Sequence, residues 1–527
     1  MAILGRLRPD MSTNPKEINF WDRYQRYLIE YKSIDFSLDV SRMFFDDYFL
    51  ERKRPMCEAA IAEMKRIEAG EKMNADEDRP VGHYWLRNSA LAPAELRDQI
   101  DADVVAANDF GRDVREGKIR GGAGETLKFY LFIGIGGSAL GPRLVTAALA
   151  DQKMREGTWF FDNTDPEGID RVIDEIGKER LRQTLVVVTS KSGNTPETRN
   201  GMLEAKRAFE ERGLNFGRHA VSVTGEGSAL WDLSERWIHR FPMYDWVGGR
   251  TSVMSMVGLV PAALQGIKIN DFLAGAKAMD DLTRDESDPA KNAAMMLALM
   301  WHWAGDGIGK KDMVILPYKD RLSLFANYLQ QLIMESLGKE LDREGGVVNQ
   351  GITVYGNKGS TDQHAYVQQL RDGLNNFFAT FIEVRNARGE NESIIVDEDA
   401  NANSGDFLQG FLRGTRKALT EGERESITIS IEQLDTFRLG MLIALFERAV
   451  GFYASFVNVN AYHQPGVESG KKAAEVFLKL MSQVRQQLLE NPENVTPETI
   501  ATQLGADPED VRHILTHLSS NPRAIPR

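Results

Sequence analysis

The sequence is poor in cysteine, with only Cys57 in 527 residues. A single thiol excludes an intramolecular disulfide, a thiolate metal cluster and a CxxC redox pair, and it fits a reducing cytoplasm. Long hydrophobic runs are also scarce. The longest conspicuous uncharged stretch, residues 251–267, contains Thr, Ser, Gly, Pro and Gln and would make a poor membrane span. The N-terminus has only a short apolar run before Arg6 and Arg8, so we expect no secretory signal and a cytoplasmic location.

Positive charge is in short supply as well. The chain has 64 Lys and Arg against 77 Asp and Glu, a formal net charge of −13. Such a surface repels phosphate backbones and anionic membranes, so we expect neither nucleic acid nor membrane as a partner. An anionic small substrate would need a local site that supplies the attraction. With 42% hydrophobic and 27% charged residues the composition is that of a folded protein, and the length indicates two or three domains.

The pattern of apolar residues divides the chain into four regions. Residues 1–125 have helical spacing and predict a helical N-terminal region. Residues 126–285 alternate short apolar runs, Gly or Ser turns and amphipathic helices, which is typical of a parallel sheet flanked by helices. Residues 286–475 repeat this pattern around a predicted helix at 322–337, and residues 476–527 predict a helical C-terminal extension. The predicted fold class is therefore α/β, with two tandem domains.

A glycine-rich turn follows the first predicted strand of the first α/β domain. Residues 132–135 lead through Gly136 to Gly137 and Ser138, where a helix begins. Backbone N–H groups of such a turn and the helix N-terminus together favour an anion. The same residues satisfy the G-x-G-x-x-A pattern of a dinucleotide fold, with Asp162 in the expected place for a nicotinamide cofactor. A strand-to-helix turn without a ligand is the third interpretation.

Hydroxyl side chains gather after a later strand of the same domain, in residues 190–195 (SKSGNT). Hydroxyls, a glycine and a Thr-Pro helix start can direct several donors to one point, which suits a phosphate monoester. A purely structural turn with Thr195 as helix N-cap is the alternative. A dinucleotide does not require this second anion-binding loop. A sugar phosphate requires one end to be bound and the other to be left free for chemistry.

Residue type and local setting make four further residues candidates for the chemistry itself. Arg250 follows two glycines, and its planar guanidinium can stabilise an oxyanion. Glu335 follows Gln331 by one helical turn and is a candidate general base. His364 can transfer a proton near neutral pH, and Lys471 stands at a helix start, where the dipole disfavours a cation. A solvated side chain or an ordinary ion pair is the alternative for each.

Taken together and in this order, these motifs resemble those of the phosphoglucose isomerase family. The match runs from residues 77–87 (EDRPVGHYWLR) to Lys471. The resemblance implies two sugar-isomerase (SIS) domains with the active site between them, and a homodimer whose subunits share site residues. It also implies reversible isomerisation of glucose 6-phosphate to fructose 6-phosphate through ring opening and a cis-enediol, in glycolysis and gluconeogenesis, with no metal or organic cofactor.

The resemblance also implies roles for individual residues. Glu335 matches the base that moves the proton, and Arg250 matches the arginine beside the developing enediolate. His364 and Lys471 match the two candidates for the ring-opening acid, and Glu197 is expected to orient His364. The residues implied to bind the sugar phosphate are Gly137, Ser138, Ser190, Lys191, Ser192, Thr195, Glu197 and Gln331.

The chain departs from the family motifs at three places. The departures are Ser192-Gly193-Asn194 in place of Thr-Phe-Thr, Leu337 in place of Asn and Pro465 in place of Trp. They fall beside the reacting groups rather than on them, so we expect altered packing and retained activity.

Three other functions stay open at this point. One is another sugar-phosphate aldose–ketose isomerase, including one that also accepts mannose 6-phosphate. Another is a non-catalytic sugar-phosphate sensor whose C-terminal helices, residues 496–518, act as a helix-turn-helix effector; the acidic start of the last helix opposes this. The third is a nicotinamide-dependent dehydrogenase. The sequence leaves open the role of the C-terminal extension, the choice between His364 and Lys471, and the natural start at Met1 or Met11.

Overall fold

The structure is a computed structural model that describes residues 18–74, 77–389, 393–490 and 496–521. Contacts within the chain divide it into two compact units, Met1–Tyr462 and His463–Arg527. The first unit contains both sheets that the sequence predicts, and the α/β fold class is confirmed.

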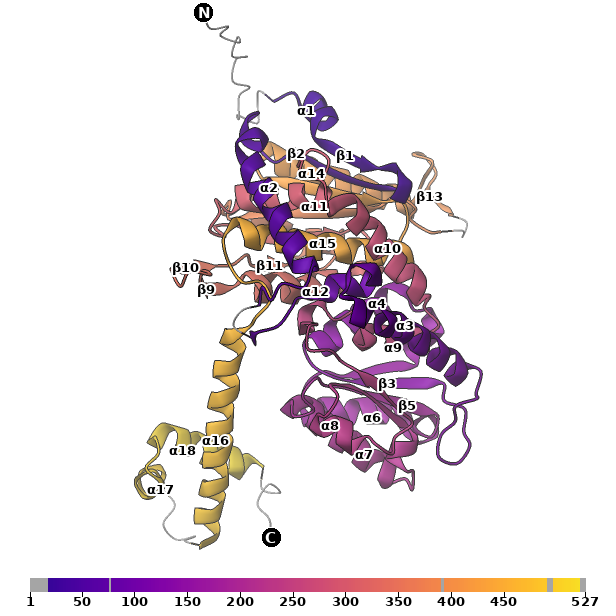
Figure 1. Ribbon diagram of the computed structural model, residues 1–527, viewed down its shortest axis with the longest axis vertical. Coiled ribbons are helices and arrows are strands. Elements are labelled where there is room, and N and C mark those ends of the chain that lie inside the picture. The colour runs from indigo at the N-terminus through magenta and orange to yellow at the C-terminus, as the bar shows by residue number, and fades with distance from the viewer. Residues whose placement is uncertain (1–17, 75–76, 390–392, 491–495, 522–527) are drawn as a thin grey trace, which may run out of the picture. The chain divides into compact units, whose positions relative to one another are not determined.

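The first sheet has five parallel strands in the order β4-β3-β5-β6-β7. Its strands are β3 (Phe129–Ile133), β4 (Thr158–Phe161), β5 (Thr184–Thr189), β6 (Ala220–Thr224) and β7 (His239–Pro242). Every residue of β5 is buried because helices cover both faces of the sheet (Figure 1). The helices of this domain are α4 (Gly137–Leu149), α5 (Gln152–Glu156), α6 (Pro166–Leu181), α7 (Pro196–Glu210) and α8 (Ala229–Leu233).

The second sheet has six strands in the order β1-β2-β15-β12-β8-β11. Its parallel part consists of β8 (Asp312–Pro317), β11 (Val354–Tyr355), β12 (Phe377–Val384) and β15 (Ser426–Ile431). In the first sheet, and in the parallel part of the second, the first strand along the chain lies between the second and the third. The two domains therefore share one topology, although the sequence shows no internal repeat. Shorter elements of this domain are α13 (Val367–Asp372), α14 (Ser404–Glu421), β9 (Lys339–Leu341), β10 (Val347–Gln350), β13 (Ile395–Asp397) and β14 (Ala402–Asn403).

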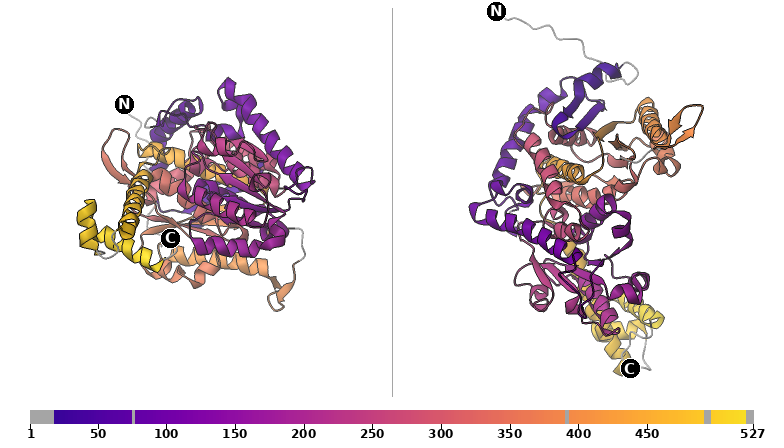
Figure 2. Two further views of the ribbon diagram at one scale, coloured as in Figure 1. Left: turned by 90° about the horizontal axis from the view of Figure 1, so that it is seen from below. Right: turned by 90° about the vertical axis from the view of Figure 1, so that its right-hand side faces the viewer.

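The prediction of a purely helical N-terminal region is wrong in one respect. Strands β1 (Leu28–Tyr31) and β2 (Phe36–Arg42) form a hairpin that adds to the second sheet, with β2 antiparallel to β15. Figure 2 shows this hairpin in indigo from two further sides. The strand β2 alternates apolar and polar residues, but its polar residues are buried rather than solvated. Asp39, for example, forms an ion pair with Arg416.

Helices fill the space between the two sheets of the first unit. The N-terminal helices are α1 (Phe20–Tyr27), α2 (Phe49–Glu68) and α3 (Ala94–Arg115). The central helices are α9 (Met256–Leu264), α10 (Ile269–Thr283), α11 (Ala293–Ala304) and α15 (Thr436–Phe456), and α15 packs against α10 and α11. Among the described helices, α15 alone is long and apolar enough to cross a membrane. Because 89% of its apolar stretch is buried within the protein, α15 is a core helix.

The second unit is a small helical body with its own core. It comprises α16 (Pro465–Glu490), α17 (Pro497–Leu504) and α18 (Pro508–Ser520). Thr496 and Asp507 cap the last two helices by accepting backbone N–H bonds, as their Thr-Pro-Glu and Asp-Pro-Glu sequences favour. The predicted domain boundary between residues 475 and 476 falls inside α16, and Lys471 belongs to this second unit.

A cluster of buried charges joins four segments of the first unit. Arg87 is the last residue of the short helical turn His83–Arg87 and forms an ion pair with Asp280 of α10, with 2.6 Å between Nε and Oδ2. Arg87 also binds Glu447 of α15. The neighbouring Arg448 contacts the same Asp280, with 2.9 Å between Nη2 and Oδ1, and binds Glu68 at the end of α2. These charges are out of water, and each arginine contacts two carboxylates, of which Asp280 is shared by both.

We predict that Asp280→Ala destabilises the first unit by about 3–5 kcal/mol, because it leaves two buried guanidinium groups without their shared carboxylate. The matched control is Asp281→Ala. Asp281 is the next residue, is 48% exposed in its side chain and pairs only with Lys277 among the described residues. The stability of both variants is measured by urea denaturation, with tryptophan fluorescence as the signal. Equal midpoints for the two variants would contradict the prediction.

Candidate active site

The glycine turn and the hydroxyl loop lie at one edge of the first sheet. The turn follows β3 and the loop follows β5, and these strands are parallel neighbours, with Phe132 opposite Val187. After β3 the chain continues to β4 on one side of β3, and β5 lies on the other side of β3. The carboxyl ends of two such strands form the crevice in which open α/β sheets bind ligands.

The hydroxyl loop is folded on itself by internal hydrogen bonds. The hydroxyl of Ser190 donates to Oγ1 of Thr195 at 3.1 Å and accepts from the backbone N–H of Gly193 at 3.1 Å. Ser192 is exposed, and its Oγ accepts from the Asn194 N–H at 3.2 Å. Gly193 has φ of +72°, a conformation that favours glycine. Ser190 and Thr195 therefore converge, at the start of α7, where donors and the helix dipole favour an anion.

The segment with Arg250 packs against the glycine turn. A Cβ atom at Gly137 would collide with the carbonyl of Gly249, so only glycine permits this approach. Ser252 reinforces the local turn by donating from Oγ to the Gly249 carbonyl at 2.7 Å. This contact brings the short helical turn Gly249–Thr251 beside the N-terminus of α4, where the half-buried Ser138 lies.

Arg250 meets Glu335, which comes from the second domain. Nη1 of Arg250 lies 3.4 Å from Oε2 of Glu335, and the two side chains are 4% and 19% exposed. Burial lowers the pKa of Arg250, while the negative charge of Glu335 opposes that shift. Oε2 of Glu335 is buried and accepts no hydrogen bond from the described residues. A carboxylate held in this way beside a cation is suited to taking and returning a proton.

Gln331 and Glu335 lie on a π-helical segment, Gln330–Glu335, and not on the regular α-helix that the sequence predicts for residues 322–337. The α-helical part is α12 (Phe325–Leu329), which runs directly into it. Gln331 reaches the glycine turn of the first domain, since a Cβ at Gly136 would be 3.1 Å from its Nε2. Single π turns within α-helices frequently occur at functional sites, because they redirect side chains.

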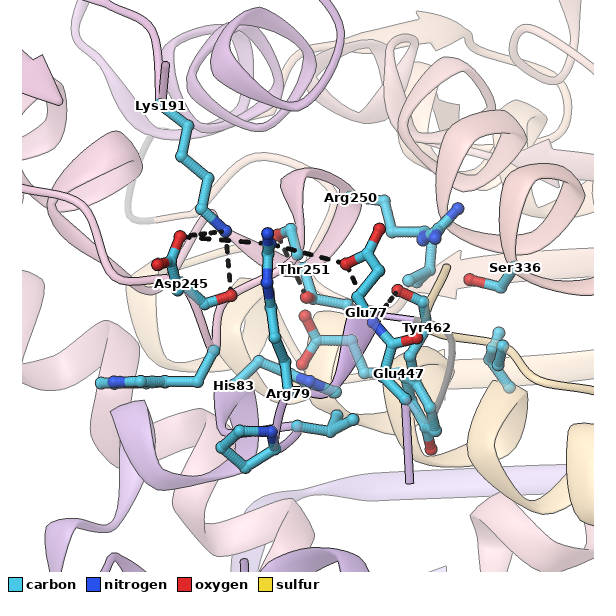
Figure 3. Close-up of a pocket in the computed structure, with 18 residues that line it drawn as sticks. Glu77, Arg79, His83, Lys191, Asp245, Arg250, Thr251, Ser336, Glu447 and Tyr462 are labelled. Atoms are coloured by element: carbon cyan, nitrogen blue, oxygen red, sulfur yellow. Dashed lines mark hydrogen bonds and ion pairs between the residues drawn. The ribbon is translucent and has the colours of Figure 1, made fainter. Parts of the chain in front are cut away.

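A cavity adjoins this pair, and Figure 3 shows the residues that line it. The lining includes Lys191, Arg250 and Ser336, together with residues to which sequence reasoning gave no role: Asn74, Glu77, Arg79, His83, Asp245, Glu447 and Tyr462. Four of these belong to the sequence EDRPVGHYWLR or lie close before it, so that motif was the available signal. At the floor, burial raises the pKa of Glu447 to about 7, against the opposing charge of Arg87.

Lys339 is a second group that sequence reasoning missed. Its side chain is buried, and Nζ donates to the backbone carbonyl of Glu335 at 2.7 Å. Burial and the nearby Arg250 lower the pKa of Lys339 to about 7, while Glu335 opposes the shift. Lys339 therefore caps the C-terminal end of the π-helical segment by binding the backbone carbonyl of Glu335.

Two of the predicted residues, His364 and Glu197, have no hydrogen bond or ion pair to this group among the residues that the structure describes. His364 ends a short helical turn, Thr361–His364, and is exposed. Among the described residues it makes no hydrogen bond or ion pair with Glu197, which lies half-buried in the first turn of α7, or with Glu335. Lys471 lies on α16, in the second unit.

Comparison with known proteins identifies the family. Residues 39–493 match the family described as phosphoglucose isomerase. The chain belongs to the phosphoglucose isomerase family. The glucose-6-phosphate isomerase of Geotalea daltonii is 53% identical over 515 residues, and that of Synechococcus elongatus is 55% identical over 510 residues, each covering 96% of both chains. The crystal structure of a glucose-6-phosphate isomerase from Chlamydia trachomatis superposes with a TM-score of 0.78 at 27% identity, covering 88% of this chain and 91% of that one.

Membership of the phosphoglucose isomerase family confirms the predicted resemblance and makes the chain an aldose–ketose isomerase with tandem sugar-isomerase domains. It favours this class over the dehydrogenase and the non-catalytic sensor, which the sequence left open. The contact between Arg250 and Glu335, like that between Gln331 and the glycine turn, joins the two domains in the site.

We predict that the pH dependence of stability reports the burial of Lys339. Its pKa is lowered to about 7 in the folded protein from 10.5, so the unfolded chain binds more protons between these values. Folded-state stability from this group therefore rises with pH over that interval. Lys339→Met removes the group, so the wild type should gain stability relative to the variant from pH 7 to pH 10 in urea denaturation. A difference that stays constant, or moves the other way, would show that Lys339 is solvated.

Proposed function

We propose that this protein interconverts glucose 6-phosphate and fructose 6-phosphate in the cytoplasm, as a step of glycolysis and gluconeogenesis. The observation that carries the proposal is the buried contact between Arg250 and Glu335, near the crevice that holds the hydroxyl loop. The names of the curated relatives give the substrate. The fit is chemical: one end of the site offers hydroxyl and N–H donors for a phosphate, and the other offers a base beside a cation.

The phosphate end fixes the position of the sugar. Ser190 and Thr195 are within hydrogen-bond distance of each other, so an oxyanion can accept from both hydroxyls. Ser192, Gly137 and Ser138 are the further contacts that the family motif implies. Holding the phosphate places carbons 1 and 2 of the open sugar toward Glu335, and a small misplacement slows the reaction strongly.

Glu335 carries the proton in this mechanism. Its carboxylate removes the proton from C2 of the open-chain aldose, which leaves a cis-enediolate, and the same carboxyl group then protonates C1 to give the ketose. Arg250 stabilises the negative oxygen as it develops, an effect for which the loss of one preorganised donor commonly costs about 3 kcal/mol. Gln331, beside the glycine turn, is placed to contact the sugar.

Ring opening needs an acid at the ring oxygen before the aldehyde can form. His364 and Lys471 are the candidates, and Glu197 would orient His364. Since His364 is exposed in the single chain, we propose that a second copy of the chain receives it. Gln363, the preceding residue, donates to the carbonyl of Phe411 on α14 at 3.4 Å. Phe411 and Phe407 are 45% and 39% exposed, an apolar surface that a homodimer would bury.

We predict that Glu335→Gln lowers kcat by at least about 1,000-fold, because the amide cannot accept the C2 proton. Affinity for fructose 6-phosphate should stay within about tenfold, or 1.4 kcal/mol. Exchange of the C2 proton with solvent deuterium, followed by NMR, measures the step directly. The control is Glu340→Gln, an exposed carboxylate five residues later. Retained exchange in Glu335→Gln would refute the assignment of the base.

The homodimer is tested by subunit mixing. Glu335→Gln and His364→Ala variants should each be nearly inactive. If His364 acts in the partner's site, a heterodimer of the two has one intact site, so random exchange in an equal mixture regains about a quarter of the wild-type rate. Mixing without recovery, although mass spectrometry shows that heterodimers have formed, would place His364 in the site of its own chain.

A further inference from the structure

Lys191 stands in the hydroxyl loop, but its ammonium group leaves that loop. Nζ donates to the backbone carbonyl of Asp245 at 2.9 Å and to that of Val247 at 3.3 Å. It also lies 3.4 Å from the Oδ1 atom of Asp245. Figure 3 shows Lys191 pointing at Asp245 from the neighbouring segment. An ammonium has three N–H donors, and the two backbone carbonyls accept from two of them. In this arrangement the side chain directs these donors at carbonyls outside the hydroxyl loop.

The carbonyls that Lys191 binds belong to the segment that delivers Arg250. Val247 is followed by Gly248, Gly249 and Arg250, and Gly249 rests against Gly137 on the glycine turn. The segment is therefore held from two sides, by a backbone contact with the glycine turn and by the ammonium from the hydroxyl loop. Both supports start at the carboxyl ends of β3 and β5.

We propose that Lys191 is a positioning residue, which fixes the distance between the phosphate-binding loop and Arg250 through the carbonyls of Asp245 and Val247. This rests on the proposed function, in which the phosphate lies at Ser190 and the enediolate at Arg250. We call these two hydrogen bonds of Lys191 the tether. The tether holds the phosphate-binding loop and Arg250 at a fixed distance, so that a sugar held by its phosphate presents its reacting carbons to Arg250 and Glu335.

The charges around Lys191 agree with a role through carbonyl contacts. Burial lowers the pKa of Lys191, and the carboxylate of Asp245 opposes that shift. The Asp245 side chain is 78% exposed, so solvent screens its attraction, and it also lies 4.0 Å from Arg79. Glu77 is the other acid near this group, and it pairs with Arg79 at 3.5 Å. The two backbone carbonyls are therefore the acceptors that hold the ammonium in place.

The test compares phosphate affinity with turnover in Lys191→Met. Inorganic phosphate is the probe of the loop, measured as a competitive inhibitor, and kcat reports the placement of Arg250. We expect phosphate affinity within about threefold of wild type and a kcat lower by about 100-fold, the loss typical of a misplacement of about 1 Å. Lys191→Arg keeps donors that can reach the carbonyls and should recover part of kcat.

Three variants give the comparison its controls. Asp245→Asn keeps both carbonyls, so it should lower kcat by only a few-fold. Lys206→Met, an exposed lysine on α7 that pairs with Glu210, should leave the rate unchanged. Ser190→Ala should weaken inorganic phosphate binding; if it does not, the proposed function is at fault and not the tether.

The proposal is overturned if Lys191→Met weakens inorganic phosphate as strongly as Ser190→Ala does, because Lys191 would then bind the phosphate itself. It is also overturned if kcat of Lys191→Met stays near wild type, or if Asp245→Asn reproduces the whole loss. Should Lys191→Met fail to fold in circular dichroism melts, the contrast between Lys191→Arg and Asp245→Asn decides: equal losses contradict the tether.

Discussion

The candidate site depends on one close approach between two backbones, at Gly137 and Gly249. No side chain fits between them, since a Cβ at Gly137 would collide with the Gly249 carbonyl. A contact between backbones has no rotamers, so the segment that follows is placed with little freedom. Arg250 comes immediately after Gly249, and this placement is what lets it reach Glu335 of the other domain at 3.4 Å. The pairing of the two domains in the site follows from this contact.

Beneath the site, buried charge limits how the helices can pack. Arg87, Asp280 and Glu447 lie in contact on three different segments, and Glu447 also lines the cavity beside Arg250. A shift of one helix against another would leave a charge without its partner in a medium of low polarity, which costs several kcal/mol. Ion pairs thus hold Glu447 beside the cavity, and the glycine contact places Arg250, which also lines it. Proton transfer over a short distance requires such fixed surroundings.

Parallel strand topology explains how much of the site the sequence could predict. Motifs at the ends of β3 and β5 had to meet, because neighbouring parallel strands end at one edge. The contact of Arg250 with Glu335 has no local signal, since the residues come from different domains, and only family motifs connected them. The hairpin of β1 and β2 was missed although β2 alternates apolar and polar residues, a pattern typical of a strand. What this pattern does not predict is the burial of Asp39, which depends on its ion pair with the distant Arg416. The direction of Lys191 could not be predicted either, because the carbonyls that hold it carry no sequence signal.

The placement of positive charge around the site affects Glu335, the proposed base. The chain carries a net charge of −13, yet its site must receive a dianionic ester. In the proposed mechanism, hydroxyls and N–H groups at the start of α7 bind the phosphate, so few cations are needed near the reacting carbons. With a pKa of about 7, Lys339 is largely neutral above that pH, which leaves Arg250 as the main cation beside the carboxylate of Glu335. Binding the phosphate through dipoles would thus separate the attraction of the substrate from the charges around Glu335, and both functions fit in one crevice.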